Sequence, residues 1–255
     1  MRKLLEKGFN LSKTEFVAYL ICPFQFYIMK DLNKQTNQSM RYDYSDYEPT
    51  LLDGIKKHQW LQEFHQTYGA DIQNNAYPRL QESDNKKNWK KKFIDYEIKR
   101  FKEKPEFWEP VAVEFFLKSQ NYRGKIDRID QINTHGHCRI VENKPYPSEF
   151  DEEELLFYTA LLTSLIPCPD LPAITKVAEI GVYYYYTGEF YKSKVTIETM
   201  RSFNDYLEKI RKKMLNPRSI KKKRVCDLDF IQCLYREICQ RINIKHQKLI
   251  GLSNI

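Results

Sequence analysis

The chain has 255 residues, of which 42% are hydrophobic and 30% are charged. These proportions exclude wholesale disorder, and 8 Gly and 11 Pro are too few for a low-complexity or collagen-like chain. Lys and Arg number 42 against 34 Asp and Glu, and the net charge of +8 is compatible with a polyanionic partner, nucleic acid first. No apolar stretch approaches the roughly 18–20 residues of a membrane span, and Lys7 falls where a signal peptide would have its apolar core. We therefore expect a cytoplasmic protein without a membrane partner.

Helical patterns stand at both ends of the chain, and a run of extended segments lies between them. Apolar residues recur at helical spacing, and the expected helices span residues 12–30, 50–68, 88–102, 148–164 and most of the chain from 197. Segments rich in β-branched and aromatic residues predict strands over residues 109–118, 121–131, 137–144, 176–187 and 189–196. This order predicts the α/β fold class, with a central mixed sheet flanked by helices.

The sharpest candidate site spans the first predicted hairpin, with the segments GKIDR at 124–128 and VENK at 141–144. Alternate residues of a strand share a face, so Glu142 and Lys144 point the same way. If the turn is centred between residues 134 and 135, Asp127 lies opposite Glu142, roughly 5 Å away at Cβ. Two carboxylates and an ammonium group would then converge on one patch of the sheet.

The chemistry of such a trio follows from its charges. Two carboxylates this close repel each other unless a cation lies between them, and carboxylate oxygens suit Mg²⁺ or Mn²⁺. A bound divalent ion lowers the pKa of a water and polarises a phosphoryl oxygen, while a nearby lysine orients that water or stabilises negative charge. These are the parts for metal-assisted hydrolysis of a phosphodiester. From spacing alone, an ordinary cross-strand ion pair on a solvated face is an equal alternative.

The same residues resemble the core motif of the PD-(D/E)XK nuclease superfamily, in which Gly-x-Ile-Asp-Arg is followed by Glu-x-Lys. Further segments are similar to motifs of its RecB-like branch. They are LSKTEF at 11–16 with CPFQFY at 22–27, Gly54-x-x-x-His58, Glu154-x-x-x-Tyr158 and Cys233-Leu-Tyr-Arg-x-x-Cys239. Within that branch the pattern is similar to the single-domain iron–sulfur exonucleases of CRISPR adaptation, and it covers about residues 10–240.

The resemblance implies a restriction-endonuclease-like core with a divalent metal centre, in a single nuclease domain over residues 1–255. Asp127 and Glu142 would be carboxylate ligands of Mg²⁺ or Mn²⁺, and the backbone carbonyl of Asn143 would complete the site. His58 would be a further ligand from the second helix, although a lone helical histidine is more often an ordinary surface or core residue. Lys144 would be the catalytic lysine.

Four further residues would contact DNA or support the ligands from behind. They are Tyr158, Glu154, Glu114 and Arg128. Glu154 departs from the glutamine of the family, and a carboxylate repels phosphates, so we expect it to brace the site rather than contact DNA. Tyr158 could equally be a core aromatic residue, because the chain has many.

Six cysteines in a cytosolic chain argue against structural disulfides and for metal binding. The resemblance implies a [4Fe–4S] cluster with the ligands Cys22, Cys226, Cys233 and Cys239. Such a cluster would join the N- and C-terminal helices, in the regions of about residues 12–30 and 220–245. The fold class then includes terminal helices joined at a cysteine-ligated cluster.

One spacing in this cysteine set departs from the family. Cys226 and Cys233 are separated by six residues, where the family usually has two. A rival interpretation is therefore a zinc site of the Cys₃His type, formed by Cys226, Cys233, Cys239 and His246. Cys138 and Cys168 have no motif around them, and we expect both to be buried.

The resemblance also implies a process and a partner. The expected activity is 5′ to 3′ exonuclease action on single-stranded DNA during CRISPR spacer acquisition, with the integrase complex as a partner. A stand-alone repair or mobile-element nuclease of the same superfamily is the first alternative. The second alternative is a DNA-binding module on the nuclease fold with weak catalysis, against which the intact Asp127, Glu142 and Lys144 argue.

Overall fold

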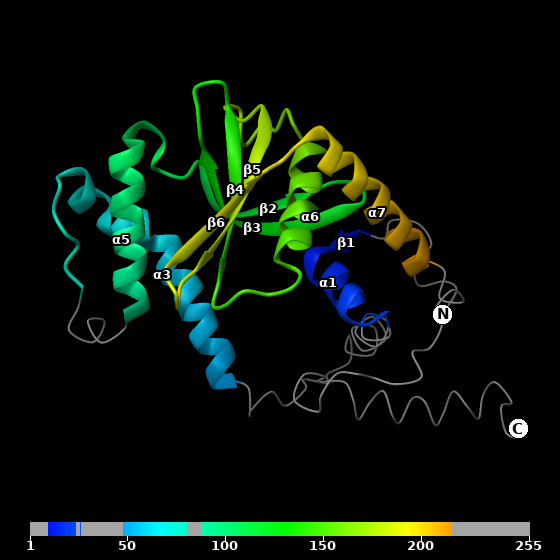
Figure 1. Ribbon diagram of the computed structural model, residues 1–255, viewed down its shortest axis with the longest axis horizontal. Coiled ribbons are helices and arrows are strands. Elements are labelled where there is room, and N and C mark those ends of the chain that lie inside the picture. The colour runs from blue at the N-terminus through cyan, green and yellow to red at the C-terminus, as the bar shows by residue number, and fades with distance from the viewer. Residues whose placement is uncertain (1–9, 24–25, 27–47, 81–87, 216–255) are drawn as a thin grey trace, which may run out of the picture. The chain divides into compact units, whose positions relative to one another are not determined.

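The computed structural model of the protein describes residues 10–23, 26, 48–80 and 88–215, with the backbone alone at 48–52 (Figure 1). The chain divides into two compact units. The larger consists of Glu6–Lys13 and Tyr44–Glu208, and the smaller of Met1–Leu5, Thr14–Asp43 and Lys209–Ile255. Most of the smaller unit lies outside the described residues, so the single domain over 1–255 stays a prediction.

The larger unit is built on a mixed sheet of six strands (Figure 1). The strands are β1 (Leu11–Ser12), β2 (Ala112–Lys118), β3 (Tyr122–Gln131), β4 (His137–Lys144), β5 (Lys176–Tyr184) and β6 (Glu189–Lys194). Their order is β1-β3-β4-β5-β6, with β2 also paired to β3. The pairs β1–β3 and β4–β5 are parallel and the others antiparallel. The expected mixed sheet is therefore confirmed, and only the short β1 was not predicted.

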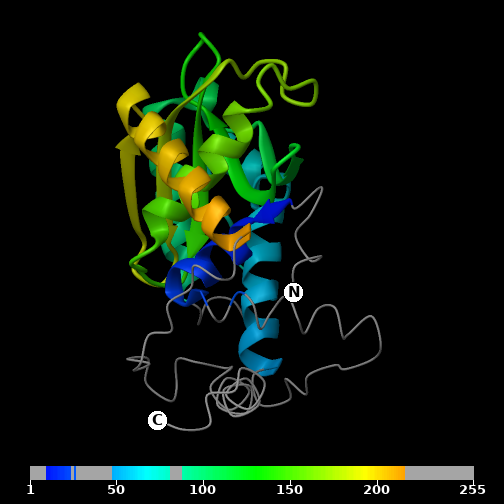
Figure 2. The same cartoon turned by 90° about the vertical axis from the view of Figure 1, so that its right-hand side faces the viewer.

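Helices flank this sheet, as the sequence predicted. The described helices are α1 (Lys13–Ile21), α3 (Glu48–Gln73), α5 (Asn88–Glu103), α6 (Asp151–Thr163) and α7 (Ile197–Leu215), with a 3₁₀ turn over Pro105–Phe107. Figure 1 shows α3 and α5 on one side of the sheet and α6 on the other, and Figure 2 shows the first turns of α3 extending past the sheet. Within the described ranges, no helix is long and apolar enough to cross a membrane.

Neighbouring residues of β5 connect the sheet to both layers of helices. Tyr183 is fully buried among aromatic residues of α3 and α5, and its ring stacks on that of Tyr96 at 4.6 Å. The next residue, Tyr184, donates a hydrogen bond to Asp151 of α6 (2.5 Å). Because neighbours in a strand point to opposite faces, the sheet has one face toward α5 and another toward α6.

The hairpin of β3 and β4 has the register that the sequence predicted. Arg128 pairs with Val141, which centres the turn between residues 134 and 135. Asn133 stabilises this turn, because its side-chain oxygen accepts hydrogen bonds from the backbone N–H groups of His135 (3.0 Å) and His137 (3.2 Å). The backbone pairing ends at Arg128 and Val141, although both strands continue. The candidate site lies where this pairing ends.

Candidate metal centre

Three carboxylate residues occupy one row across three adjacent strands. The pairs on either side of Glu114 in β2 place it opposite Asp127 of β3. The last pair between β3 and β4, Arg128 with Val141, puts Asp127 next in register to Glu142. Residues opposite each other across strands point to the same face. The predicted approach of Asp127 and Glu142 is therefore present, and Glu114 joins the same row.

The end of the β3–β4 pairing gives Asp127 its orientation. Its Oδ2 accepts a hydrogen bond from the backbone N–H of Asn143 (2.9 Å). The backbone pairing of β3 and β4 has already ended at Arg128 and Val141, so the Asp127 side chain takes the place of a backbone acceptor for this N–H. Glu114 is held differently, because its backbone is in the left-handed region (φ 49°) and its carboxylate forms an ion pair with Lys125. Both carboxylates are thus fixed before any ligand binds.

His58 on α3 completes a group that can hold a metal ion. Its Nδ1 lies 3.8 Å from Glu114 Oε1 and 3.8 Å from Asp127 Oδ2. One ligand atom from each of the three residues lies within 4.8 Å of the others. The contact with Glu114 is the main cause that raises the pKa of His58, and the charge of Asp127 adds to it. The predicted convergence of His58 and Asp127 is therefore seen in the geometry, with Glu114 as the third member.

Glu142 is a buried carboxylate that lies close to other carboxylates. The residue is 4% exposed, and its Oε1 has no hydrogen-bond partner among the described residues. Burial, together with the charge of Asp127, raises the pKa of Glu142 to about 8. Burial likewise raises the pKa of Asp127. A divalent cation between these groups would favour their charged forms, so the donor set fits Mg²⁺ or Mn²⁺.

Lys144 follows Glu142 on the same face of β4 and reaches α6. Its Nζ lies 2.6 Å from Asp151 Oδ1 and 2.9 Å from Glu154 Oε1. Asp151 also accepts hydrogen bonds from Tyr184 (2.5 Å) and from the backbone N–H of Ser148 (2.9 Å). The ammonium group is thus held by two carboxylates of the first turn of α6. The sequence predicted Asp151 only as part of a helix start, and that helix begins at Asp151 rather than at Ser148.

Lys13 is a site residue to which the sequence assigned no role. It follows β1 directly, whose residues Leu11 and Ser12 pair with the beginning of β3. Lys13 Nζ lies 2.9 Å from Glu154 Oε2 and 3.6 Å from Glu142 Oε2. Burial alone would lower the pKa of Lys13, but the carboxylates of Glu142 and Glu154 outweigh it and raise the pKa. Its position inside the LSKTEF segment was the one available signal.

A profile of the PD-(D/E)XK nuclease superfamily matches residues 10–240, which include every residue just described. The chain belongs to this superfamily. A search of curated proteins found no match. Members of the superfamily are typically metal-dependent nucleases, and the sheet flanked by helices is consistent with their restriction-endonuclease-like core. The RecB-like branch and the CRISPR adaptation family stay predictions.

Within this superfamily fold, Glu154 and Tyr158 support the site from α6. Glu154 lies between Lys13 and Lys144, which fits a bracing role better than a contact with DNA. Tyr158 is 3% exposed, and a Cβ at Gly124 would come within 2.6 Å of its ring. The glycine that opens the nuclease motif therefore makes room for Tyr158.

Arg128 does not lie with the metal centre, and its burial does not fit a contact with DNA, whereas its support of the metal ligands from behind stays a prediction. Its side chain is buried and donates to Glu97 of α5 (2.7 Å) and to Asp130 (3.1 Å). Glu97 also binds Arg100 (2.6 Å). Burial alone would raise the pKa of Glu97, but Arg100 and Arg128 outweigh it and lower the pKa. Because Arg128 follows Asp127 in a strand, it points to the opposite face, toward α5.

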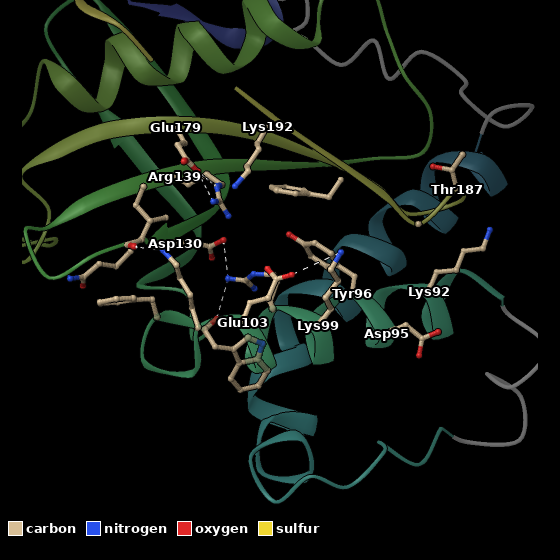
Figure 3. A pocket seen from close by; sticks show the side chains of 18 residues that line it. Lys92, Asp95, Tyr96, Lys99, Glu103, Asp130, Arg139, Glu179, Thr187 and Lys192 are labelled. Carbon is tan, nitrogen blue, oxygen red and sulfur yellow. Dashed lines mark hydrogen bonds and ion pairs between the residues drawn. The ribbon is translucent and has the colours of Figure 1, made fainter. Parts of the chain in front are cut away.

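A cavity of about 730 Å³ lies on this opposite face, between α5 and the strands β3–β6 (Figure 3). Its lining includes Tyr96 and Lys99 of α5 and Asp130 of β3. The ion pair of Arg139 and Glu179 (2.9 Å) lies in its wall. Neither His58, Glu142 nor Lys144 lines it, so the cavity is separate from the metal centre.

The cysteine predictions are tested only in part. Cys22, Cys138 and Cys168 are free thiols, and the last two are buried, as expected. Cys226, Cys233, Cys239 and His246 lie outside the described residues. The [4Fe–4S] cluster and the rival zinc site therefore stay predictions. The same holds for the backbone carbonyl of Asn143 as a metal ligand.

Proposed function

We propose that the protein is a metal-dependent deoxyribonuclease that hydrolyses single-stranded DNA from an end. The observation that carries this proposal is the row of Glu114, Asp127 and Glu142 beside His58, with the ammonium group of Lys144 fixed on the same face. Membership of the PD-(D/E)XK superfamily supports the reaction class. An ordinary ion pair on a solvated face would not leave Glu142 buried with an oxygen that has no hydrogen-bond partner in the described part of the chain.

His58, Glu114, Asp127 and Glu142 are the residues that would hold the ion. When bound, a divalent ion would lower the pKa of a water and polarise a phosphoryl oxygen. Carboxylates suit Mg²⁺ and Mn²⁺, whereas an imidazole is a better ligand for transition ions, so His58 favours Mn²⁺ over Mg²⁺.

Lys144 acts through its position and its charge. Asp151 and Glu154 hold its ammonium group, which limits where its N–H donors can point. An ammonium group fixed in this way stabilises negative charge that develops on the phosphoryl oxygen and orients the attacking water. Lys13 contacts Glu142 of β4 and Glu154 of α6, and Glu154 also contacts Lys144 of β4, so these ion pairs connect both site residues to α6.

The finer parts of the proposal rest on the resemblance of the motifs. They are 5′ to 3′ polarity, a role in CRISPR spacer acquisition with an integrase complex as partner, and a [4Fe–4S] cluster on Cys22, Cys226, Cys233 and Cys239. The arrangement of the carboxylates and Lys144 supports phosphodiester hydrolysis and does not depend on these parts.

The test is cleavage of end-labelled single-stranded DNA in Mg²⁺, Mn²⁺ and EDTA, with anaerobically purified protein to protect a cluster. Wild type should cut only with a divalent ion, and Lys144→Ala should lose at least about a hundredfold in rate, as removal of one electrostatic stabiliser does. Lys194→Ala, an exposed lysine of β6, is the matched control and should cut like wild type.

Three other outcomes would change the proposal. Equal cutting by wild type and Lys144→Ala would point to a contaminating nuclease. Internal fragments without end products would replace the exonuclease by an endonuclease. If folded wild-type protein binds DNA and never cuts it, the alternative of a DNA-binding module on the nuclease fold would remain.

A further inference from the structure

The hairpin of β2 and β3 continues the row of carboxylates with an aromatic residue and three basic ones. Phe116 pairs with Lys125, and Lys118 pairs with Arg123. These are the next two positions on the face that carries Glu114 and Asp127, because alternate residues of a strand share a face. All four side chains are exposed, whereas Leu117 between them on β2 is buried. We call Phe116, Lys118, Arg123 and Lys125 the hairpin face.

Phe116 is unusual among the exposed apolar residues because of its surroundings. It is 60% exposed, and single exposed apolar side chains are ordinary on protein surfaces. Phe116, however, stands one position beyond Glu114 on its face of β2, and its partner Lys125 forms an ion pair with that same Glu114. An aromatic ring between cations, at the border of a site for phosphodiesters, matches the composition of surfaces that bind single-stranded nucleic acid.

We propose that Phe116 stacks on an unpaired base of the DNA substrate and that the hairpin face guides the strand into the metal centre. This inference rests on the proposed function. The basic side chains of Lys118 and Arg123 attract the phosphates, while Phe116 contacts a base without reading its identity. A base inside a duplex is already stacked and paired, so this surface selects a single strand or a frayed end.

The spacing limits which base Phe116 can reach. Residues two apart in a strand are separated by about 6.7 Å, which is about two steps at the 3.4 Å spacing of duplex DNA and fewer steps in a more extended single strand. The stacked base is therefore within about three nucleotides of the phosphate that is cut. An abasic nucleotide at that one position should remove the stack and leave the phosphate contacts unchanged.

The experiment measures binding of a fluorescent oligothymidylate to proteins that also carry Lys144→Ala, so that no cleavage interferes. Phe116→Ala should weaken binding by about 5- to 150-fold, the loss expected from removing one base–aromatic stack. Phe116→Trp should keep the affinity. Tyr77→Ala removes another exposed aromatic side chain, on the α5 side, and should bind like its parent.

A set of oligothymidylates with one abasic position each provides the decisive comparison. At one position close to the cut, the abasic change should weaken binding by the parent protein and have no further effect on Phe116→Ala. Equal binding by the parent and Phe116→Ala would overturn the inference, as would a loss that is the same for every abasic oligonucleotide. The thermal midpoint of Phe116→Ala should match that of its parent, because the side chain is exposed.

This test separates the inference from the function on which it rests. Metal-dependent cutting by wild type together with unchanged binding by Phe116→Ala would remove only the stacking role. A loss of binding at one abasic position that appears in the parent and is absent in Phe116→Ala, together with no cutting by wild type, would keep the stacking surface and remove the nuclease.

Discussion

Lys13→Met tests whether Lys13 supports the metal centre, and it leaves every proposed metal ligand unsubstituted. Methionine keeps much of the length and apolar stem of lysine and removes the ammonium group. Lys13 Nζ lies 2.9 Å from Glu154 Oε2 and 3.6 Å from Glu142 Oε2. Its removal leaves Glu142 facing Asp127 and Glu154 with one cation fewer, which raises the pKa of Glu142 further and leaves Glu154 without its 2.9 Å partner.

The expected loss of stability follows from these two contacts. The 2.9 Å contact is a charge-assisted hydrogen bond, which contributes about 1.5–3 kcal/mol. The 3.6 Å contact is purely electrostatic and is partly screened, because the Lys13 side chain is 25% exposed. We expect a total loss of about 2–3 kcal/mol, which lowers the thermal midpoint of a chain of this size by about 4–12 °C.

Differential scanning calorimetry of metal-free protein, with and without added Mn²⁺, checks this expectation. Lys194→Met, at an exposed position of β6, is the control and should unfold within about 2 °C of wild type. Saturating Mn²⁺ should narrow the gap between Lys13→Met and wild type, since the ion would supply the positive charge that Lys13 provided. A loss in Lys13→Met no larger than in the control, or a gap that Mn²⁺ does not change, would refute the reasoning.

Two further predictions concern Glu142 and Gly124. Because the pKa of Glu142 is raised from 4.5 to about 8, the folded metal-free protein binds a proton that the unfolded chain has released, and its stability should fall as the pH rises from about 5 to 8. Urea unfolding across this range should give a smaller decline for Glu142→Gln, and an equal decline would contradict the assignment. Gly124→Ala should cost about 1–3 kcal/mol of unfolding free energy, because the new Cβ meets the ring of Tyr158. Gly54→Ala in α3, with nothing within 4 Å of its Cβ, should instead gain about 0.5–1 kcal/mol in the same measurement.

The local patterns of the sequence were sufficient to predict the helices and every strand except β1, together with one long-range feature. The register of β3 and β4 follows from a single turn, because side chains in strands alternate strictly and a turn fixes which residues lie opposite. This is why the approach of Asp127 and Glu142 could be predicted. The aromatic packing of α3 and α5 against β5 follows from the burial of the apolar faces of these elements.

The residues that the sequence missed are those placed by contacts between distant segments. Lys13 reaches the site only because β1 pairs with β3, and a two-residue strand leaves no periodic signal. The sequence indicated Asp151 only as part of a helix start, and its carboxylate does accept a hydrogen bond from the backbone N–H of Ser148. The same carboxylate also binds Lys144, which no local pattern could indicate. Arg128 contacts Glu97 rather than the metal centre, because a neighbour of Asp127 in sequence points to the other face of the strand.

Arg128 and Asp127 are adjacent in β3, and this adjacency links the two faces of the sheet. The buried guanidinium group of Arg128 is fixed by Glu97 and Asp130, so the peptide between the two residues cannot rotate freely. The backbone of β3 is therefore anchored on the α5 face by this salt-bridge network, while Asp127 on the other face belongs to the row of carboxylates. The cavity beside α5, which Arg100 and Asp130 help to line, thus lies against this same network on the face of the sheet opposite the metal centre.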